Sequence, residues 1–104
     1  MRSTRRTAAT RTPDLERLRP TVLRIARSHG VRNLRVFGSF ARGEQTRRSD
    51  LDLLVEMPVG SSLLDLAGLK IDLEEAIKRK VDVVPAKCIK PLLRAHILSE
   101  SRPL

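Results

Sequence analysis

The sequence predicts one small domain of the α/β (α+β) class. A length of 104 residues suits a single domain, and an apolar content of 40% is enough for one modest core. Segments with helical spacing also alternate with short strand-like runs, in the order helix, strand, short helix, strand, helix, strand, helix. No internal repeat interrupts this order, so each element can be taken in turn.

The first predicted helix covers at least residues 20–28 and ends at Gly30, a residue type that suits the position after a helix. Its extension back through Leu15 is left open, because Pro20 inside a helix would remove a backbone hydrogen bond. A short strand at residues 33–37 follows and leads into a turn and the start of a short helix.

The later elements lie between clear breaks in the sequence. They are a loop at 44–49, a strand at 51–56, a helix at 63–79, a strand at 81–84 and a helix at 91–99. Ser62 and Asp65 have the spacing of a capping box at the start of the long helix. An apolar stripe predicts that this helix lies on the sheet, and its members are Leu66, Leu69, Leu73, Ala76 and Ile77.

The charge of the chain is strongly basic and unevenly distributed. The formal net charge is +9, which favours a polyanion or an acidic protein surface as partner. Residues 1–12 contain four arginines and no acid, so we predict a disordered basic arm there and a folded domain at residues 13–104. Because only 2% of residues are aromatic, with no Trp or Tyr, a base-stacking surface is disfavoured and nucleic acid is not expected as a partner.

Composition also excludes several classes of protein. Cys88 is the single cysteine, so it can form no internal disulfide and has no second thiol for a zinc site. No apolar run approaches the ~20 residues of a membrane span, and no signal-like segment follows the start. We therefore expect a cytoplasmic protein without a membrane partner.

The stretch from Gly38 to Arg42 is typical of a phosphate-binding turn. A glycine and a serine directly after a strand present backbone N–H groups and the positive end of a helix dipole to an anion. Gly38 permits close approach, the Ser39 hydroxyl can reach a phosphate, and Arg42 can lean back over it. Many Gly-Ser pairs serve only to cap a helix, so this stretch alone leaves both interpretations open.

Asp50 and Asp52 form an acidic pair at the start of a predicted strand. Alternation places both carboxylates on one face, where they repel each other unless a divalent cation lies between them; a solvated strand end is the alternative. Asp82 favours the cation, because it interrupts an otherwise apolar strand. If the two strands are neighbours, ~4.8 Å apart, three carboxylates could hold two Mg²⁺ ions for a displacement at phosphorus.

The two motifs together resemble the signature of the nucleotidyltransferase superfamily, which includes DNA polymerase beta and kanamycin nucleotidyltransferase. That signature is Gly38-Ser39, ten intervening residues, and Asp50-Leu51-Asp52. The fuller stretches 37–43 and 49–55 are similar to its minimal branch, the MNT proteins encoded beside HEPN-domain partners. The resemblance covers about residues 20–100.

The resemblance implies a role for each motif residue. It assigns the triphosphate to Gly38, Ser39 and Arg42, and the metal ions and catalysis to Asp50, Asp52 and Asp82. Asp82 would lie nearest the incoming nucleophile and help to deprotonate it. The implied fold is a small mixed sheet with helices packed on one face and the other face open for the nucleotide. Phe40 stands where the family often has a smaller or basic residue, and we expect activity to survive this departure.

The resemblance also implies a reaction and a partner. In the minimal branch the MNT protein is an antitoxin that uses ATP and two Mg²⁺ ions to transfer AMP to a tyrosine of a HEPN ribonuclease toxin. This chain contains no tyrosine, so it cannot modify itself in that way. The toxin, or self-association of the chain, is expected to complete the site around the base and the acceptor.

Two other functions are weighed against adenylyl transfer. A non-catalytic antitoxin, or binding subunit, could neutralise a toxin by contact alone, but it would have no reason to keep Asp82. A nucleic-acid-binding module would use the net charge of +9, yet its unneutralised carboxylates would repel a phosphate backbone. We expect surface or structural roles for the other polar candidates, His29, Arg47, Arg48, Lys78, Arg79, Lys80 and His96.

Overall fold

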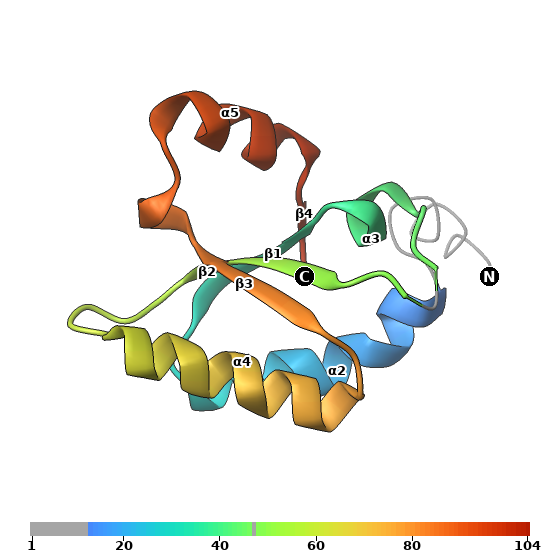
Figure 1. Cartoon of the computed structure of the whole chain (residues 1–104), viewed down its shortest axis with the longest axis horizontal. Helices are drawn as coiled ribbons and strands as arrows, with labels where there is room; N and C mark the ends of the chain where they lie inside the picture. The colour runs from blue at the N-terminus through green and yellow to red at the C-terminus, as the bar shows by residue number, and fades with distance from the viewer. Residues whose placement is uncertain (1–12, 47) are drawn as a thin grey trace.

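A computed structural model describes residues 13–46 and 48–104 of the chain (Figure 1). In chain order the elements are α2 (Pro13–Ser28), β1 (Arg32–Phe37), α3 (Ser39–Arg42), β2 (Leu51–Glu56), α4 (Leu63–Ile77), β3 (Val81–Pro85), the 3₁₀ turn η1 (Ala86–Cys88), α5 (Pro91–Glu100) and β4 (Arg102–Pro103). The predicted arm at residues 1–12 and Arg47 lie outside the described residues. Within the described part, no helix is long and apolar enough to cross a membrane.

The four strands form one mixed sheet in the order β3-β2-β1-β4. β1 is antiparallel to β2 and to β4, whereas β2 and β3 are parallel. Parallel neighbours need a crossover connection, and α4 provides it between β2 and β3. The register places Asp52 opposite Phe37 on one side and opposite Asp82 on the other. The predicted mixed sheet is therefore confirmed.

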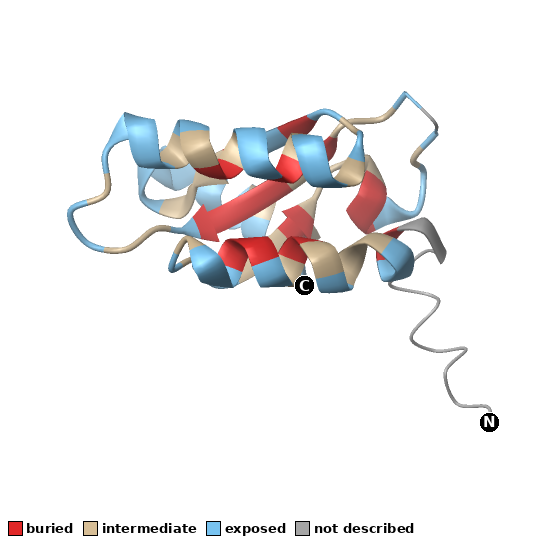
Figure 2. Ribbon diagram, turned by 90° about the horizontal axis from the view of Figure 1, so that it is seen from below, coloured by how far each residue is buried: buried red, intermediate tan, exposed pale blue. Residues whose placement is uncertain are grey.

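Helices α2 and α4 pack on one face of this sheet and enclose the core with it (Figure 1). Figure 2, viewed from the side of these two helices, shows buried strand residues behind them. In β2, Leu51, Leu53 and Val55 are buried in this core, so strand alternation turns Asp52 and Leu54 toward the opposite face. Helix α5 lies on that opposite side (Figure 1), which is therefore open only in part.

Helix α2 begins at Pro13 and includes Pro20, which settles the extension that the sequence left open. Burial explains why the proline is tolerated: Leu15, five residues before it, and Val22, two residues after it, are both fully buried in the core. Tertiary packing of this kind routinely outweighs local propensity. Gly30 follows the helix with a φ of 76°, as the sequence predicted for its end.

Differences from the predicted elements lie at the ends of α4 and α5. Helix α4 ends at Ile77, two residues early, because Lys78 adopts a φ of 56° as its C-cap, and Ala76 is exposed rather than in the core. Helix α5 continues to Glu100. The two-residue strand β4 was not predicted; beside it, the amide of Leu104 donates to the carbonyl of Leu34 at 3.0 Å.

Candidate active site

The turn after β1 brings Gly38 directly against the carboxylate of Asp52. Gly38 has a φ of 74° and a ψ of −151°, a conformation that side chains strongly disfavour. A Cβ atom added there would overlap Oδ2 of Asp52 and would lie only 3.1 Å from its Cγ. Glycine is therefore required at this position both by the backbone and by the neighbouring acid.

The short helix α3 offers backbone donors close to this acid. Gly38 is its N-cap, and the Gly38 carbonyl accepts hydrogen bonds from the amides of Ala41 (3.1 Å) and Arg42 (3.2 Å). Among the described residues, no hydrogen-bond acceptor faces the amides of Ser39 and Phe40. Free amides at the start of a helix can bind an anion, as the sequence predicted for this turn.

Strand pairing places Asp52 beside Asp82, as predicted from the two motifs. Asp52 is half-buried and Asp82 is exposed. Asp50 directly precedes β2 in the chain and is also half-buried. Burial raises the pKa of the Asp52 carboxyl above its ordinary value of 3.8, and the negative charges of Asp82 and Asp50 raise it further. The three acids therefore interact electrostatically, and a divalent cation would relieve their repulsion.

The donor set fits magnesium by its chemistry, because carboxylate oxygens are the ligands that Mg²⁺ prefers. The side chains do not form a finished coordination shell. Within residues 13–46 and 48–104, no three acidic, histidine or cysteine side chains are gathered closely enough to hold a metal ion. The backbone thus pairs Asp52 with Asp82, and Asp50 contributes its charge from the end of the loop.

Arg42 lies near the acids but is engaged by another partner. Its Nε donates to Oε1 of Glu44 at 2.9 Å, and Nη1 is 3.9 Å from Oε1 of Glu100. The hydrogen bond with Glu44 is the main reason that the pKa of Arg42 is raised. The positive charge of Arg42 in turn lowers the pKa of Asp52, against the effects of burial and of the other acids. Arg42 would have to exchange Glu44 for a phosphate in order to act as the sequence predicted.

Arg79 is a residue of the site region whose role the sequence did not reveal. Its Nη1 donates to the carbonyls of Thr46 (3.1 Å) and Ser49 (2.8 Å), so it holds the loop that leads into Asp50. Its guanidinium carbon also lies 5.0 Å from the centre of the Phe40 ring. From the sequence we expected only a surface or structural role for Arg79, as a cation at the end of a helix. The structure shows which role it has: this side chain ties together the two segments that carry the motifs.

Phe40 itself is fully buried, which explains the departure from the family pattern. Its ring belongs to the core under α3 and stands next to Ser39 in the chain. A large apolar side chain at this position anchors the one-turn helix to the sheet. The sequence shows an aromatic residue at this position, but the motif alone could not show which way the ring points.

The start of β3, which carries Asp82, is fixed by two side chains of α4. Lys70 Nζ donates to the carbonyl of Val81 at 2.7 Å, and the amide of Val81 donates to Oε2 of Glu74 at 2.9 Å. The Val81 amide is the main reason that the pKa of Glu74 is lowered. The position of Asp82 along the edge of the site therefore depends on helix packing as well as on strand pairing.

These features can be compared with known proteins. The sequence profile of the nucleotidyltransferase domain matches residues 15–104. The chain belongs to this family. It is therefore an enzyme of nucleotidyltransferase type, and the family resemblance read from the two motifs is confirmed.

Two relatives of this nucleotidyltransferase domain cover most of its length. A candidate protein adenylyltransferase from Methanocaldococcus jannaschii is 43% identical over 88 residues, which cover 85% of this chain and 95% of that protein. The protein adenylyltransferase MntA from Thermococcus cleftensis is 38% identical over 71 residues, which cover 68% of this chain and 72% of that protein.

Solved structures agree with the fold. A candidate minimal nucleotidyltransferase has a TM-score of 0.79 and 46% identity, and the match covers 89% of this chain and 98% of that one. The MNT antitoxin in complex with a tri-AMPylated HEPN toxin of Shewanella oneidensis gives a TM-score of 0.68 at 17% identity, covering 85% of this chain and 69% of that one. At that identity the second match shows the shared fold alone.

Proposed function

We propose that this nucleotidyltransferase domain is an antitoxin that transfers AMP from ATP to a HEPN-type partner protein. The observation that carries the proposal is the contact of Gly38 with Asp52, whose strand neighbour is Asp82. This contact joins a phosphate-binding turn to a pair of acids at one edge of the sheet. The names of the relatives support adenylyl transfer to a protein, and the absence of a membrane-spanning helix among the described residues is compatible with a cytoplasmic site of action.

The phosphate-binding part of the proposal rests on α3. The amides of Ser39 and Phe40 and the Ser39 hydroxyl would donate hydrogen bonds to the triphosphate of ATP. Gly38 lets that phosphate approach the sheet edge without a side chain in the way. Arg42 would turn from Glu44 to the β- and γ-phosphates and offset their charge.

The acids supply the second part of the proposed mechanism. Asp50, Asp52 and Asp82 would hold two Mg²⁺ ions, which when bound supply positive charge to the attacking and leaving oxygens. An acceptor hydroxyl, proposed to be that of a tyrosine, attacks the α-phosphorus of ATP. The new bond joins this oxygen to phosphorus, the bond to pyrophosphate breaks, and a carboxylate oxygen of Asp82 takes the proton of the hydroxyl.

The proposal is tested by incubating the purified chain with ATP, Mg²⁺ and the protein encoded in the neighbouring reading frame. We expect intact-mass measurement to show one or more added AMP groups on that protein, and peptide mapping to place them on tyrosine. The matched control is the Asp50→Ala/Asp52→Ala variant, which should leave the acceptor unmodified. A tight complex without any transfer would overturn catalysis and favour an antitoxin that acts by contact alone.

A further inference from the structure

A cavity of about 540 Å³ lies on the sheet face that carries Asp52. Its walls come from the end of β2, the first turn of α4, η1 and α5, and its floor includes Leu54 and Arg35, which are opposite each other in the sheet. Leu54 points to the same face as Asp52 and follows it by two residues, or about 7 Å along the strand. Leu54, which lines the cavity, is therefore the next residue after Asp52 on this face of β2, so the cavity adjoins the candidate active site.

Two exposed leucines line this cavity. Leu63 lines it with 83% of its surface exposed, and Leu98 lines it from α5 with 40% exposed. Helix α5, all of whose residues the structure describes, has no buried residue, and its Leu92 is 91% exposed. Large apolar surface of this kind is unfavourable in water and is typical of a protein interaction site.

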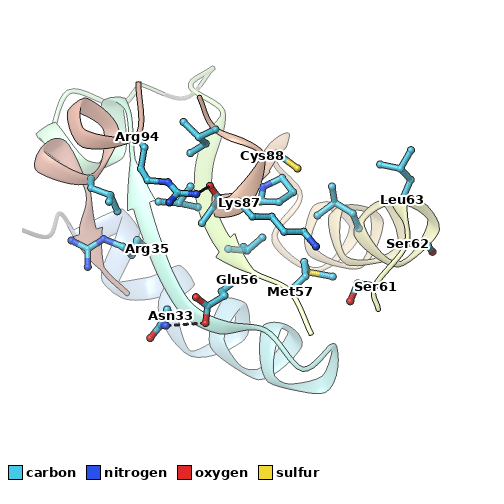
Figure 3. A pocket seen from close by; sticks show the side chains of 17 residues that line it. Asn33, Arg35, Glu56, Met57, Ser61, Ser62, Leu63, Lys87, Cys88 and Arg94 are labelled. Atoms are coloured by element: carbon cyan, nitrogen blue, oxygen red, sulfur yellow. Dashed lines mark hydrogen bonds between the residues drawn. The ribbon is translucent and has the colours of Figure 1, made fainter. Parts of the chain in front are cut away.

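Positive charge dominates the polar part of the wall. Arg35, Lys87 and Arg94 line the cavity, against one acid, Glu56 (Figure 3). Arg35 donates to Ser101 and Arg94 donates to the carbonyl of Ala86, so both use neutral acceptors. Within residues 13–46 and 48–104, no carboxylate lies within 4.0 Å of any of these three cations.

We propose that this cavity docks a segment of the acceptor protein that carries apolar side chains flanked by carboxylates. The inference rests on the proposed function, because a segment held here would place the residues next to it over Asp52 and Asp82. An apolar side chain would fill the cavity beside Leu54 and Leu63, and the flanking acids would pair with Lys87 and Arg94.

Charge separates this occupant from the alternatives. A second copy of this chain, with its net charge of +9, would bring like charges together at the interface. The nucleotide is expected at the other end of the sheet face, where Gly38 and the start of α3 lie. An acid-flanked apolar segment is complementary to both the leucines and the cations.

Leu63→Asp tests the apolar contact with little risk to folding. Leu63 is the first residue of α4 after the Ser62 N-cap, where a carboxylate suits the helix dipole. Leu64→Asp is the matched control, because Leu64 is also 83% exposed in the same helical turn but does not line the cavity. The probe is the purified neighbouring-frame protein, and its affinity is measured by titration calorimetry without ATP or Mg²⁺.

We expect Leu63→Asp to weaken this affinity by at least ~10-fold, the loss expected for one buried leucine, and Leu64→Asp to change it by less than ~2-fold. Lys87→Glu should weaken binding and reduce its salt dependence, whereas Arg24→Glu, on the exposed side of α2, should not. Circular dichroism would verify that all four variants remain folded.

Several outcomes would overturn the inference. Equal losses of partner affinity in Leu63→Asp and Leu64→Asp would do so, and so would an unchanged partner affinity in Leu63→Asp. Weaker ATP binding by Leu63→Asp would instead make the cavity part of the nucleotide site. A wild-type protein that is a dimer and becomes a monomer in Leu63→Asp would make the cavity an interface between two copies. Because partner affinity is measured without ATP or Mg²⁺, failure of the proposed function can be told apart from failure of this inference. In that case the wild type binds the partner but transfers no AMP. Weakened binding with an active wild type supports both proposals.

Discussion

The two ends of the open sheet face differ in what determines their structure. At one end, Gly38, Asp52 and Asp82 are brought together by strand register and by a turn that has no room for a side chain. At the other end, the cavity is formed by apolar and basic side chains from several separate elements, among them β2, α4, η1 and α5. Chemistry in this small domain thus depends on the backbone of the sheet, whereas the proposed recognition of the partner depends on side chains that can vary without changing the sheet.

This difference separates the expected effects of substitutions. Changes at the acidic end should lower kcat for AMP transfer and leave the affinity for the partner intact. Changes at the cavity should weaken that affinity and raise the KM for the acceptor, with little change in kcat at saturating acceptor. A variant that impaired both equally would mean that the two ends form one functional unit. The predictions below use this contrast, beginning with the largest expected effect.

Asp52→Asn should reduce AMP transfer by at least ~10³-fold, because several kcal/mol of charge stabilisation at the phosphorus is lost with one metal-binding carboxylate. The side chain keeps nearly the same shape, so the fold and the cavity should be unaffected. Transfer is measured by intact mass of the acceptor, and partner affinity by calorimetry. Substantial transfer by this variant would remove Asp52 from the proposed mechanism.

Arg79→Ala should lower kcat by roughly 10- to 100-fold, the range typical of a residue that orients metal ligands. The loss of its bonds to Thr46 and Ser49 would release the loop before Asp50. The KM for the acceptor should change little, since the cavity is at the other end. Arg79→Lys should recover part of kcat, because a lysine can keep one of the two carbonyl contacts. A rise in acceptor KM without a fall in kcat would contradict this positioning role.

Gly38→Ala should destabilise the fold by about 1–3 kcal/mol, as expected for a side chain forced into this backbone conformation. Part of that cost comes from the overlap with Asp52, so it should be smaller in an Asp52→Gly background. Urea unfolding of the four proteins of this double-mutant cycle measures both terms. Strict additivity would mean that backbone strain alone, and not the close contact, requires glycine.

Most of the sheet and much of the site could be predicted from the sequence, because short-range patterns determine them. The alternation of apolar and polar residues predicted the strand that contains Asp52. The Gly38-Ser39 turn and an aspartate at position 82 in an apolar strand indicated that the candidate acids lie at the same end of the sheet as the turn. From the sequence, Asp82 was expected beside the acidic pair only if the two strands were neighbours. The structure shows that they are, in a parallel register that pairs Asp52 with Asp82 and with α4 as the connection between them.

The features that the sequence did not reveal depend on contacts between distant segments. Arg79 has the local pattern of a helix-ending cation, and only the folded chain shows its two carbonyl partners 30 and 33 residues earlier. Strand β4 is two residues long and includes a proline, so no alternation marks it. Leu66 lines the cavity. In the sequence it is only a member of the apolar stripe of α4, and its place in the cavity depends on η1 and α5, which come later in the chain.

The smallest expected effect is on stability, and it has the opposite sign to the effect on catalysis. Burial and the neighbouring acids raise the pKa of Asp52 in the folded state above its ordinary value of 3.8. Below that value the carboxyl is protonated in both states, so wild type and Asp52→Asn should be equally stable. As pH rises through the raised pKa, the folded wild type loses the proton at a cost, and its stability should fall below that of the variant. Thermal unfolding between about pH 3.5 and about pH 7 should therefore show a gap in Tm that opens with pH. Because Asp52 is partly exposed, screening by solvent should keep this gap small. Added Mg²⁺ at neutral pH should close this gap in Tm, because it should stabilise the wild type alone. A gap that does not change with pH or with Mg²⁺ would show that repulsion between the carboxylates of Asp50, Asp52 and Asp82 does not affect the stability of the fold.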